Sequence, residues 1–115
     1  MGLFGTAGVR GPVTDRLTPD LAVQFGQAVA SELAVPDLVV SVARDGRTSG
    51  PALEAAVTAG LLAGGVTVQR LGVVTTPLLA FASRSGVGVM VTASHNPPGD
   101  NGLKLFIDGQ EADRD

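Results

Sequence analysis

The segment from residue 90 to residue 104 collects most of the side chains in this chain that could do chemistry. It contains the only histidine of the sequence, His95, and the only lysine, Lys104, and Ser94 stands directly before the histidine. A hydroxyl, an imidazole and an ammonium group can act as nucleophile, general base and phosphate-binding cation. Apolar runs before and after the polar stretch predict that it is a loop between two strands.

Two kinds of chemistry fit this loop. Ser94 and His95 could be the nucleophile and base of a hydrolase, but neighbouring residues on an extended loop point in different directions, and catalytic triads usually combine distant residues. Phosphate binding fits better, because Asn96, Asn101 and loop amides can donate hydrogen bonds while Lys104 supplies a positive charge. The turn sequences rich in Pro and Gly leave a third interpretation open, an ordinary surface connection.

Residues 4–11 form a second segment suited to an anion. Three glycines surround Thr6 and Arg10, so that backbone amides can approach a ligand closely and the guanidinium can bind two phosphate oxygens. The same glycines would also fit an irregular strand in which they only serve turns.

Residues 44–50 form a third segment, directly after a predicted buried strand. Ligand crevices in open α/β sheets lie at the carboxyl ends of strands, which is where this turn falls. Asp45 and Arg47 are two residues apart around Gly46. We expect the two side chains to pair and brace the turn rather than to contact a ligand.

These three segments resemble, in the same order, the motifs of the alpha-D-phosphohexomutases, which include phosphomannomutase, phosphoglucomutase and phosphoglucosamine mutase. The sequence Thr-Ala-Ser-His-Asn-Pro at residues 92–97, followed by Asp-Asn-Gly-Leu-Lys at residues 100–104, is similar to the active-site loop of the family. Residues 4–11 are similar to the opening motif, and residues 44–49 to the Asp-x-Arg turn. Ala43 departs from the glycine that is common before that turn.

The resemblance implies an isomerase that moves phosphate between C6 and C1 of a hexose or hexosamine phosphate. Ser94 would carry a phosphoryl group and exchange it through a sugar bisphosphate, while Arg10 would line the site. His95 and Lys104 would be the candidates for general base, and Lys104 could instead clamp phosphate. The resemblance implies Mg2+ as cofactor, bound by an oxygen of the Ser94 phosphate and by an Asp-Gly-Asp loop, which this sequence lacks.

Further site residues follow from the same motifs. The expected phosphate-binding residues are Thr6, Asn96, Asn101 and Gly102. Asp45 and Arg47 are expected to support the floor of the site. The motifs are slightly closer to the phosphoglucosamine mutase and phosphomannomutase branches than to the long eukaryotic phosphoglucomutases.

Motifs for sugar recognition and for the final phosphate-binding loop are also missing from this sequence. We therefore expect residues 1–115 to be a single domain, the N-terminal phosphoserine-bearing domain of a four-domain mutase that needs its remaining domains for turnover. The alternative is a stand-alone phosphate-binding or regulatory module without turnover.

Composition narrows the class of protein. The chain has 115 residues, 44% of them hydrophobic, which suits one domain with one core. A net charge of -3 and an aromatic content of 3% argue against nucleic acid as a partner. Apolar runs are too short to cross a membrane, cysteine is absent and no secretory signal is evident, so we expect a cytoplasmic protein.

Alternating helix and strand patterns predict the fold class. Helices are expected to begin near residues 18, 50 and 76, the last capped by Thr76 before Pro77, and strands are expected at residues 38–42, 66–68, 87–91 and 103–107. The alternation predicts a three-layer α/β/α domain with a mixed, mostly parallel sheet of about four strands. The short return after the 90–104 loop predicts that the last strand is antiparallel.

Overall fold

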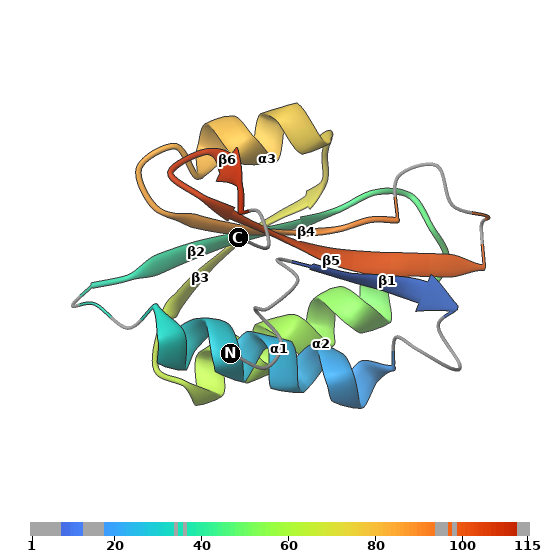
Figure 1. Ribbon diagram of the computed structural model, residues 1–115, viewed down its shortest axis with the longest axis horizontal. Coiled ribbons are helices and arrows are strands. Elements are labelled where there is room, and N and C mark those ends of the chain that lie inside the picture. Colours follow the sequence, from blue (N-terminus) through green and yellow to red (C-terminus); the bar gives the residue numbers. More distant parts are fainter. Residues whose placement is uncertain are drawn as a thin grey trace.

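The computed structural model of the chain is a sheet flanked by helices (Figure 1). It describes residues 8–12, 18–33, 35, 37–93, 97 and 99–112, and of residues 8–12 the backbone alone. The elements are, in chain order, β1 (Gly8–Pro12), α1 (Pro19–Glu32), β2 (Val39–Arg44), α2 (Gly50–Ala63), β3 (Thr67–Val73), α3 (Thr76–Ala82), β4 (Val87–Val91), β5 (Asp100–Ile107) and β6 (Gln110–Glu111).

The described strands form one six-stranded mixed sheet in the order β1-β5-β4-β2-β3, with β6 paired to β5. β2 is parallel to β3 and β4, whereas β5 is antiparallel to β1, β4 and β6. The fold class is confirmed, and so is the antiparallel return after the 90–104 loop. The sheet exceeds the expected four strands because residues 8–12 add an edge strand and a turn at Asp108 and Gly109, both with positive φ, leads into β6.

Threonines cap two of the helices. The Oγ1 of Thr18 accepts a hydrogen bond from the amide of Leu21 at 3.1 Å. At α3 the cap is Thr75, whose Oγ1 accepts from the amide of Leu78 at 3.3 Å, so the expectation that Thr76 is the cap was wrong by one residue. Thr75 has the extended backbone that a capping residue needs, and Thr76 already lies within the helix.

Helices cover both faces of the sheet, with α1 and α2 on one side and α3 on the other (Figure 1). Alternate residues of the central strands therefore enter two separate cores. Val89 of β4 and Leu105 of β5 belong to the larger core, which includes residues of α1 and α2. Met90 and Phe106 belong to the smaller core, which includes Leu79 of α3.

The backbones of α1 and α2 touch where the two helices cross. A Cβ atom on Gly26 would meet the carbonyl oxygen of Val57 and the amide nitrogen of Leu61. A Cβ atom on Gly60 would meet the carbonyl oxygen of Val23. Glycine at these two positions allows both helices to lie on the same face of the sheet.

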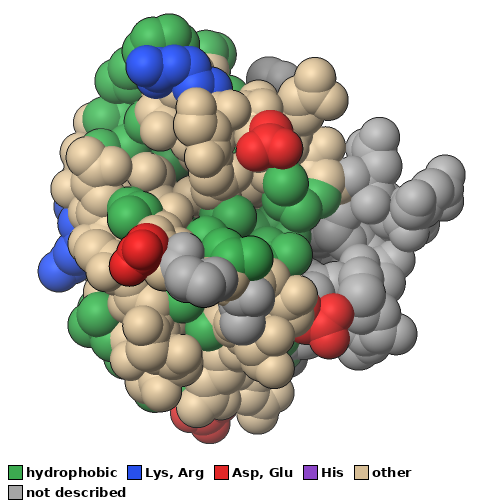
Figure 2. All heavy atoms as spheres, turned by 90° about the vertical axis from the view of Figure 1, so that its left-hand side faces the viewer, with side chains coloured by type: hydrophobic (Ala, Val, Ile, Leu, Met, Phe, Trp, Pro, Cys, Tyr) green, Lys and Arg blue, Asp and Glu red, His purple; other side chains and the backbone are tan. Residues whose placement is uncertain are grey.

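The amino ends of β2 and β4 border an open hollow of about 790 Å³. Val39, Val87 and Ile107 contribute to its lining, together with the acidic residues Asp37 and Asp108. Figure 2 faces this end of the sheet and shows hydrophobic side chains gathered at its middle.

No helix in the described part of the chain has the length and apolar character needed to cross a membrane.

Candidate active site at the carboxyl ends of β2 and β4

The site is built where two neighbouring parallel strands end. Arg44, the last residue of β2, is the register partner of Val91, the last residue of β4. The amide of Asp45 donates to the carbonyl oxygen of Val91 at 3.1 Å, which extends the pairing by one residue. The turn of residues 45–49 therefore begins beside the loop that leads from β4 to β5.

Asp45 holds both of these segments. Its Oδ1 accepts from the amide of Arg47 at 3.2 Å, and its Oδ2 accepts from the Nε of the same residue at 3.2 Å. The hydroxyl of Thr92 donates to that Oδ2 at 2.6 Å. Because the acceptor is a carboxylate, these bonds are stronger than bonds between neutral groups.

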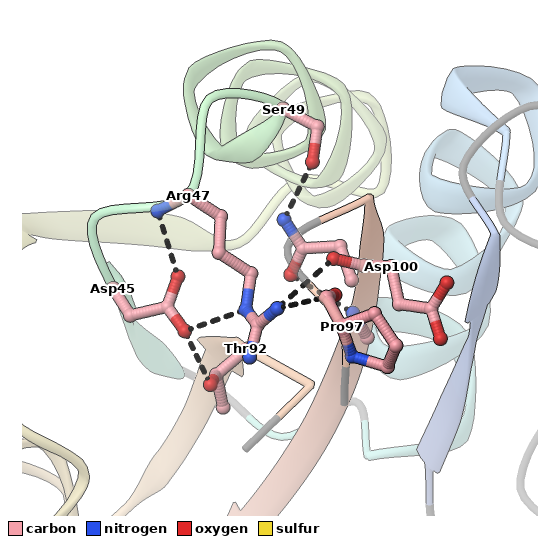
Figure 3. Close-up of polar contacts among 8 residues, drawn as sticks. Asp45, Arg47, Ser49, Thr92, Pro97 and Asp100 are labelled. Carbon is pink, nitrogen blue, oxygen red and sulfur yellow. Dashed lines mark hydrogen bonds and ion pairs between the residues drawn. The ribbon is translucent and has the colours of Figure 1, made fainter. Parts of the chain in front are cut away.

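Arg47 extends the contact to the far side of the loop (Figure 3). Its Nη1 donates to the carbonyl oxygen of Pro97 at 2.8 Å and reaches that of Asp100 at 3.5 Å. The side chain of Arg47 is 13% exposed, so its guanidinium is largely withdrawn from water. Asp45 and Arg47 thus form an ion pair that holds the backbone on both sides of residues 94–96.

A second contact ties the start of β5 to the start of α2. The Nδ2 of Asn101 donates to the Oγ of Ser49 at 2.9 Å, and its Oδ1 accepts from the amide of Gly102 at 2.9 Å. Ser49 precedes α2 but makes no capping bond with its own side chain. Asn101 is fully buried, so its amide group supports the loop. The hydrogen-bonded residues Asp45, Arg47, Ser49, Thr92, Pro97, Asp100, Asn101 and Gly102 are called the frame of the loop below.

The backbone register brings the expected cations toward the same loop. Gly102 of β5 is paired with Arg10 of β1, and its carbonyl oxygen accepts from the amide of Thr92 at 2.9 Å. Arg10 and Thr92 therefore flank Gly102 on its two sides. Lys104 is the register partner of Met90, which assigns it to the α3 face of the sheet.

Several predicted site residues are not covered by this geometry. Ser94, His95, Asn96 and Thr6 lie outside the described residues, and so does the side chain of Arg10. The described residues on either side of the first three are bonded to the 45–49 turn, Thr92 through its hydroxyl and Pro97 through its carbonyl oxygen.

Two residues of the frame had no role in the sequence analysis. Thr92 and Ser49 are bonded to partners 47 and 52 positions away in the chain. A signal was present, because short hydroxyl residues directly after a strand or before a helix commonly bond to nearby polar groups. The particular partners depend on the strand order, which the local sequence does not contain.

The described residues do not by themselves form a ligand set for a divalent cation. No group of three or more His, Asp or Glu side chains within them could hold a metal ion. The Asp45 carboxylate at this end already accepts bonds from Arg47 and Thr92.

Comparison with known proteins agrees with the fold and the motifs. The family model for the phosphoglucomutase/phosphomannomutase alpha/beta/alpha domain I matches residues 1–115. The chain therefore belongs to this family.

Individual relatives are similar over most of this chain. A phosphoglucosamine mutase from Natranaerobius thermophilus is 52% identical over 107 residues, which cover 90% of this chain and 24% of that protein. A phosphopentomutase from Thermococcus kodakarensis is 47% identical over 114 residues, which cover 96% of this chain and 25% of that protein.

A solved structure has the same fold. It is a phosphoglucomutase/phosphomannomutase family protein from Burkholderia thailandensis, with a TM-score of 0.83 and 39% sequence identity. The match covers 93% of this chain and 26% of that one. The chain thus spans about a quarter of the length of the relatives it matches.

Proposed function

We propose that this chain is the phosphoserine-bearing domain of a phosphosugar mutase, with Ser94 as the residue that carries the phosphoryl group. The observation that supports the proposal most is the clamp formed by Asp45 and Arg47. It fixes Thr92, two residues before Ser94, and Pro97, three residues after it. A nucleophile on a loop must be held in a narrow range of positions, because small displacements of a reacting group cost rate steeply.

The charges favour Arg10 and Lys104 as the phosphate-binding cations. A phosphoserine carries about −1.5 to −2 charges at neutral pH, and the sugar phosphate adds further negative charge. The positive charge of Arg47 is already compensated by Asp45, and its described bonds go to oxygens of the frame. The strands of Arg10 and Lys104 adjoin the loop through Gly102 and Met90.

The proposed reaction has two transfers. A hydroxyl of the sugar monophosphate attacks the phosphorus on Ser94, its proton passes to His95 or Lys104, and the bond from phosphorus to the serine Oγ breaks. The resulting sugar bisphosphate reorients in the site and the Oγ of Ser94 attacks its other phosphorus. The bond from that phosphorus to the sugar oxygen breaks, and the proton held by His95 or Lys104 passes to that oxygen. Thr6 and Asn96 would bind the phosphate during both transfers, while Asn101 and Gly102, which are hydrogen-bonded to Ser49 and Thr92, would support the loop.

Turnover would require parts outside this chain. We propose that a hexose or hexosamine phosphate is recognised by further domains of the same mutase, which would also supply ligands for Mg2+. An assay must compare several sugar phosphates as substrates, since one relative is named a phosphoglucosamine mutase and another a phosphopentomutase.

The test is an activity assay of the complete reading frame with Mg2+ and the phosphates of glucosamine, mannose, glucose and a pentose. We expect Ser94→Ala to lose activity by at least about a thousandfold, because the covalent route is removed. Ser85→Ala, a serine change at the opposite end of the sheet, should retain activity. An active Ser94→Ala variant would refute the phosphoserine, and phosphate binding without turnover in the unmodified protein would instead identify a binding module.

A further inference from the structure

Glu54 is a buried carboxylate outside the site described so far. It lies in the second turn of α2 and its side chain is 4% exposed. Its Oε1 accepts from the Nε of Arg44 at 2.8 Å, and its Oε2 accepts from the Nε of Arg70 at 2.9 Å. A buried carboxylate with two guanidinium partners joins α2 to both β2 and β3.

The two arginines differ in position. Arg44 ends β2 and directly precedes Asp45, whereas Arg70 lies within β3 at the sheet edge. The side chain of Arg44 is 23% exposed and that of Arg70 is 55% exposed. The ion pair of Arg44 with Glu54 joins the residue before the 45–49 turn to the helix after the turn. The ion pair of Arg70 with Glu54 does not enclose this turn.

The path of the Arg44 side chain strengthens this difference. A Cβ atom on Gly50 would lie 3.3 Å from the Cδ of Arg44, so the aliphatic part of the arginine passes directly over the first residue of α2. The carbonyl oxygen of Arg44 accepts from the amide of Val74 at 3.2 Å, which anchors the strand end from its other neighbour. The turn is thus closed between a fixed strand end and a fixed helix start.

We infer that Arg44 and Glu54 are positioning residues for the proposed phosphoryl transfer. They hold the end of β2 against the start of α2, which sets the direction in which Asp45 and Arg47 reach Thr92 and Pro97. This inference rests on the proposed function for its effect on rate. Its structural part, the effect of Arg44 on the 45–49 turn, stands separately.

Arg44→Met and Arg70→Met make a matched pair for the test. Both keep an unbranched side chain, both remove one guanidinium from Glu54, and both leave the other in place. The first measurement is hydrogen exchange of the Arg47 amide, which donates to Asp45, in the full chain by NMR. We expect Arg44→Met to speed its exchange about tenfold more than Arg70→Met, relative to the amide of Val89 in β4.

The second measurement uses the complete reading frame. Arg44→Met should lower kcat about tenfold with KM changed by less than about twofold, because a misplaced loop affects the transfer more than binding. Glu54→Gln should shift both measurements in the same direction, since glutamine has one acceptor oxygen for two arginine donors and carries no compensating charge. Arg70→Met should leave kcat unchanged.

Equal exchange of the Arg47 amide in the two methionine variants would overturn the inference, and so would an unchanged kcat in Arg44→Met. Failure of the proposed function is distinguishable, because it would appear as an active Ser94→Ala variant while the exchange measurement still reports on the turn.

Discussion

The two ends of β2 and β4 carry different kinds of surface. At the carboxyl ends, side chains from segments about fifty positions apart converge in hydrogen bonds around one loop, and the bonds of Asp45 and Arg47 are charge-assisted. At the amino ends lies the hollow of about 790 Å³. Ser83 and Arg84 in its lining donate to carbonyl oxygens within their own segment, at 3.0 and 2.9 Å, and Ser41 donates across two strands to Gln69 at 3.2 Å. The proposed site is therefore supported by the convergence of polar groups on a loop and not by the size of a hollow.

The difference follows from the connections of the chain. Open α/β sheets place ligand crevices at the carboxyl ends of their strands, and the turn after β2 and the loop after β4 both fall at that end. The opposite end receives the segments that lead into the same strands. Among the described residues, polar side chains from segments about fifty positions apart therefore meet at the carboxyl ends.

The largest effect is expected from a substitution at the carboxyl ends of β2 and β4. Asp45→Ala removes the acceptor for both Arg47 and Thr92, so the loop loses its clamp and Arg47 keeps an uncompensated charge. We expect kcat of the complete reading frame to fall about a hundredfold, the loss typical of a displaced reacting group. Glu32→Gln, which removes a carboxylate from the rim of the amino-end hollow, should leave kcat unchanged. Equal losses in the two variants would remove the distinction between the ends.

A substitution where α1 and α2 cross lies between the two ends of the sheet and should destabilise the whole fold. Gly60→Ala introduces a methyl group against the carbonyl oxygen of Val23, so α1 and α2 must separate. We expect the free energy of unfolding to fall by about 1–3 kcal/mol, measured by urea denaturation.

Gly46 provides the matched control for that change. It lies in the 45–49 turn, and a Cβ atom there would have no neighbouring atom within 4 Å. Gly46→Ala should therefore alter the free energy of unfolding by less than about 0.5 kcal/mol. A larger loss at Gly46 than at Gly60 would show that the turn is packed more tightly than this account holds.

At the amino end we expect a smaller effect than that of Gly60→Ala. Ser41 is 3% exposed, and Ser41→Ala deletes its described side-chain hydrogen bond, which goes to the side chain of Gln69. We expect the free energy of unfolding to fall by about 0.5–1.5 kcal/mol, as for a single neutral hydrogen bond, and kcat to stay the same. A loss of kcat comparable with that of Asp45→Ala would assign the amino end a part in the reaction.

Local patterns in the sequence were sufficient for the three helices and for β2 to β5, but not for β1 and β6. The Thr18–Pro19 start of α1, the buried runs of β2 and β4 and the antiparallel return of β5 were all predicted, since each depends on neighbouring residues. The family and the three motif segments were also recognised from residues alone.

The contacts between segments could not be predicted in the same way. The bond from Asn101 to Ser49, the bond from Thr92 to Asp45 and the pairing of β1 with β5 each join residues far apart in the sequence. Their partners are fixed by the order of the strands in the sheet. The local patterns are compatible with several strand orders. Residues 8–12 in particular lack the alternation that marks a strand, because two of the five are glycine and one is proline.

The proposed role of Ser94 is tested by locating the phosphoryl group in the complete protein during turnover. After incubation with a sugar bisphosphate, mass spectrometry of the peptide that contains Ser94 should show one added phosphoryl group on that serine, and an excess of sugar monophosphate should remove it. Sustained mutase turnover with Ser94 unmodified, or with the phosphoryl group on another residue, would contradict the account.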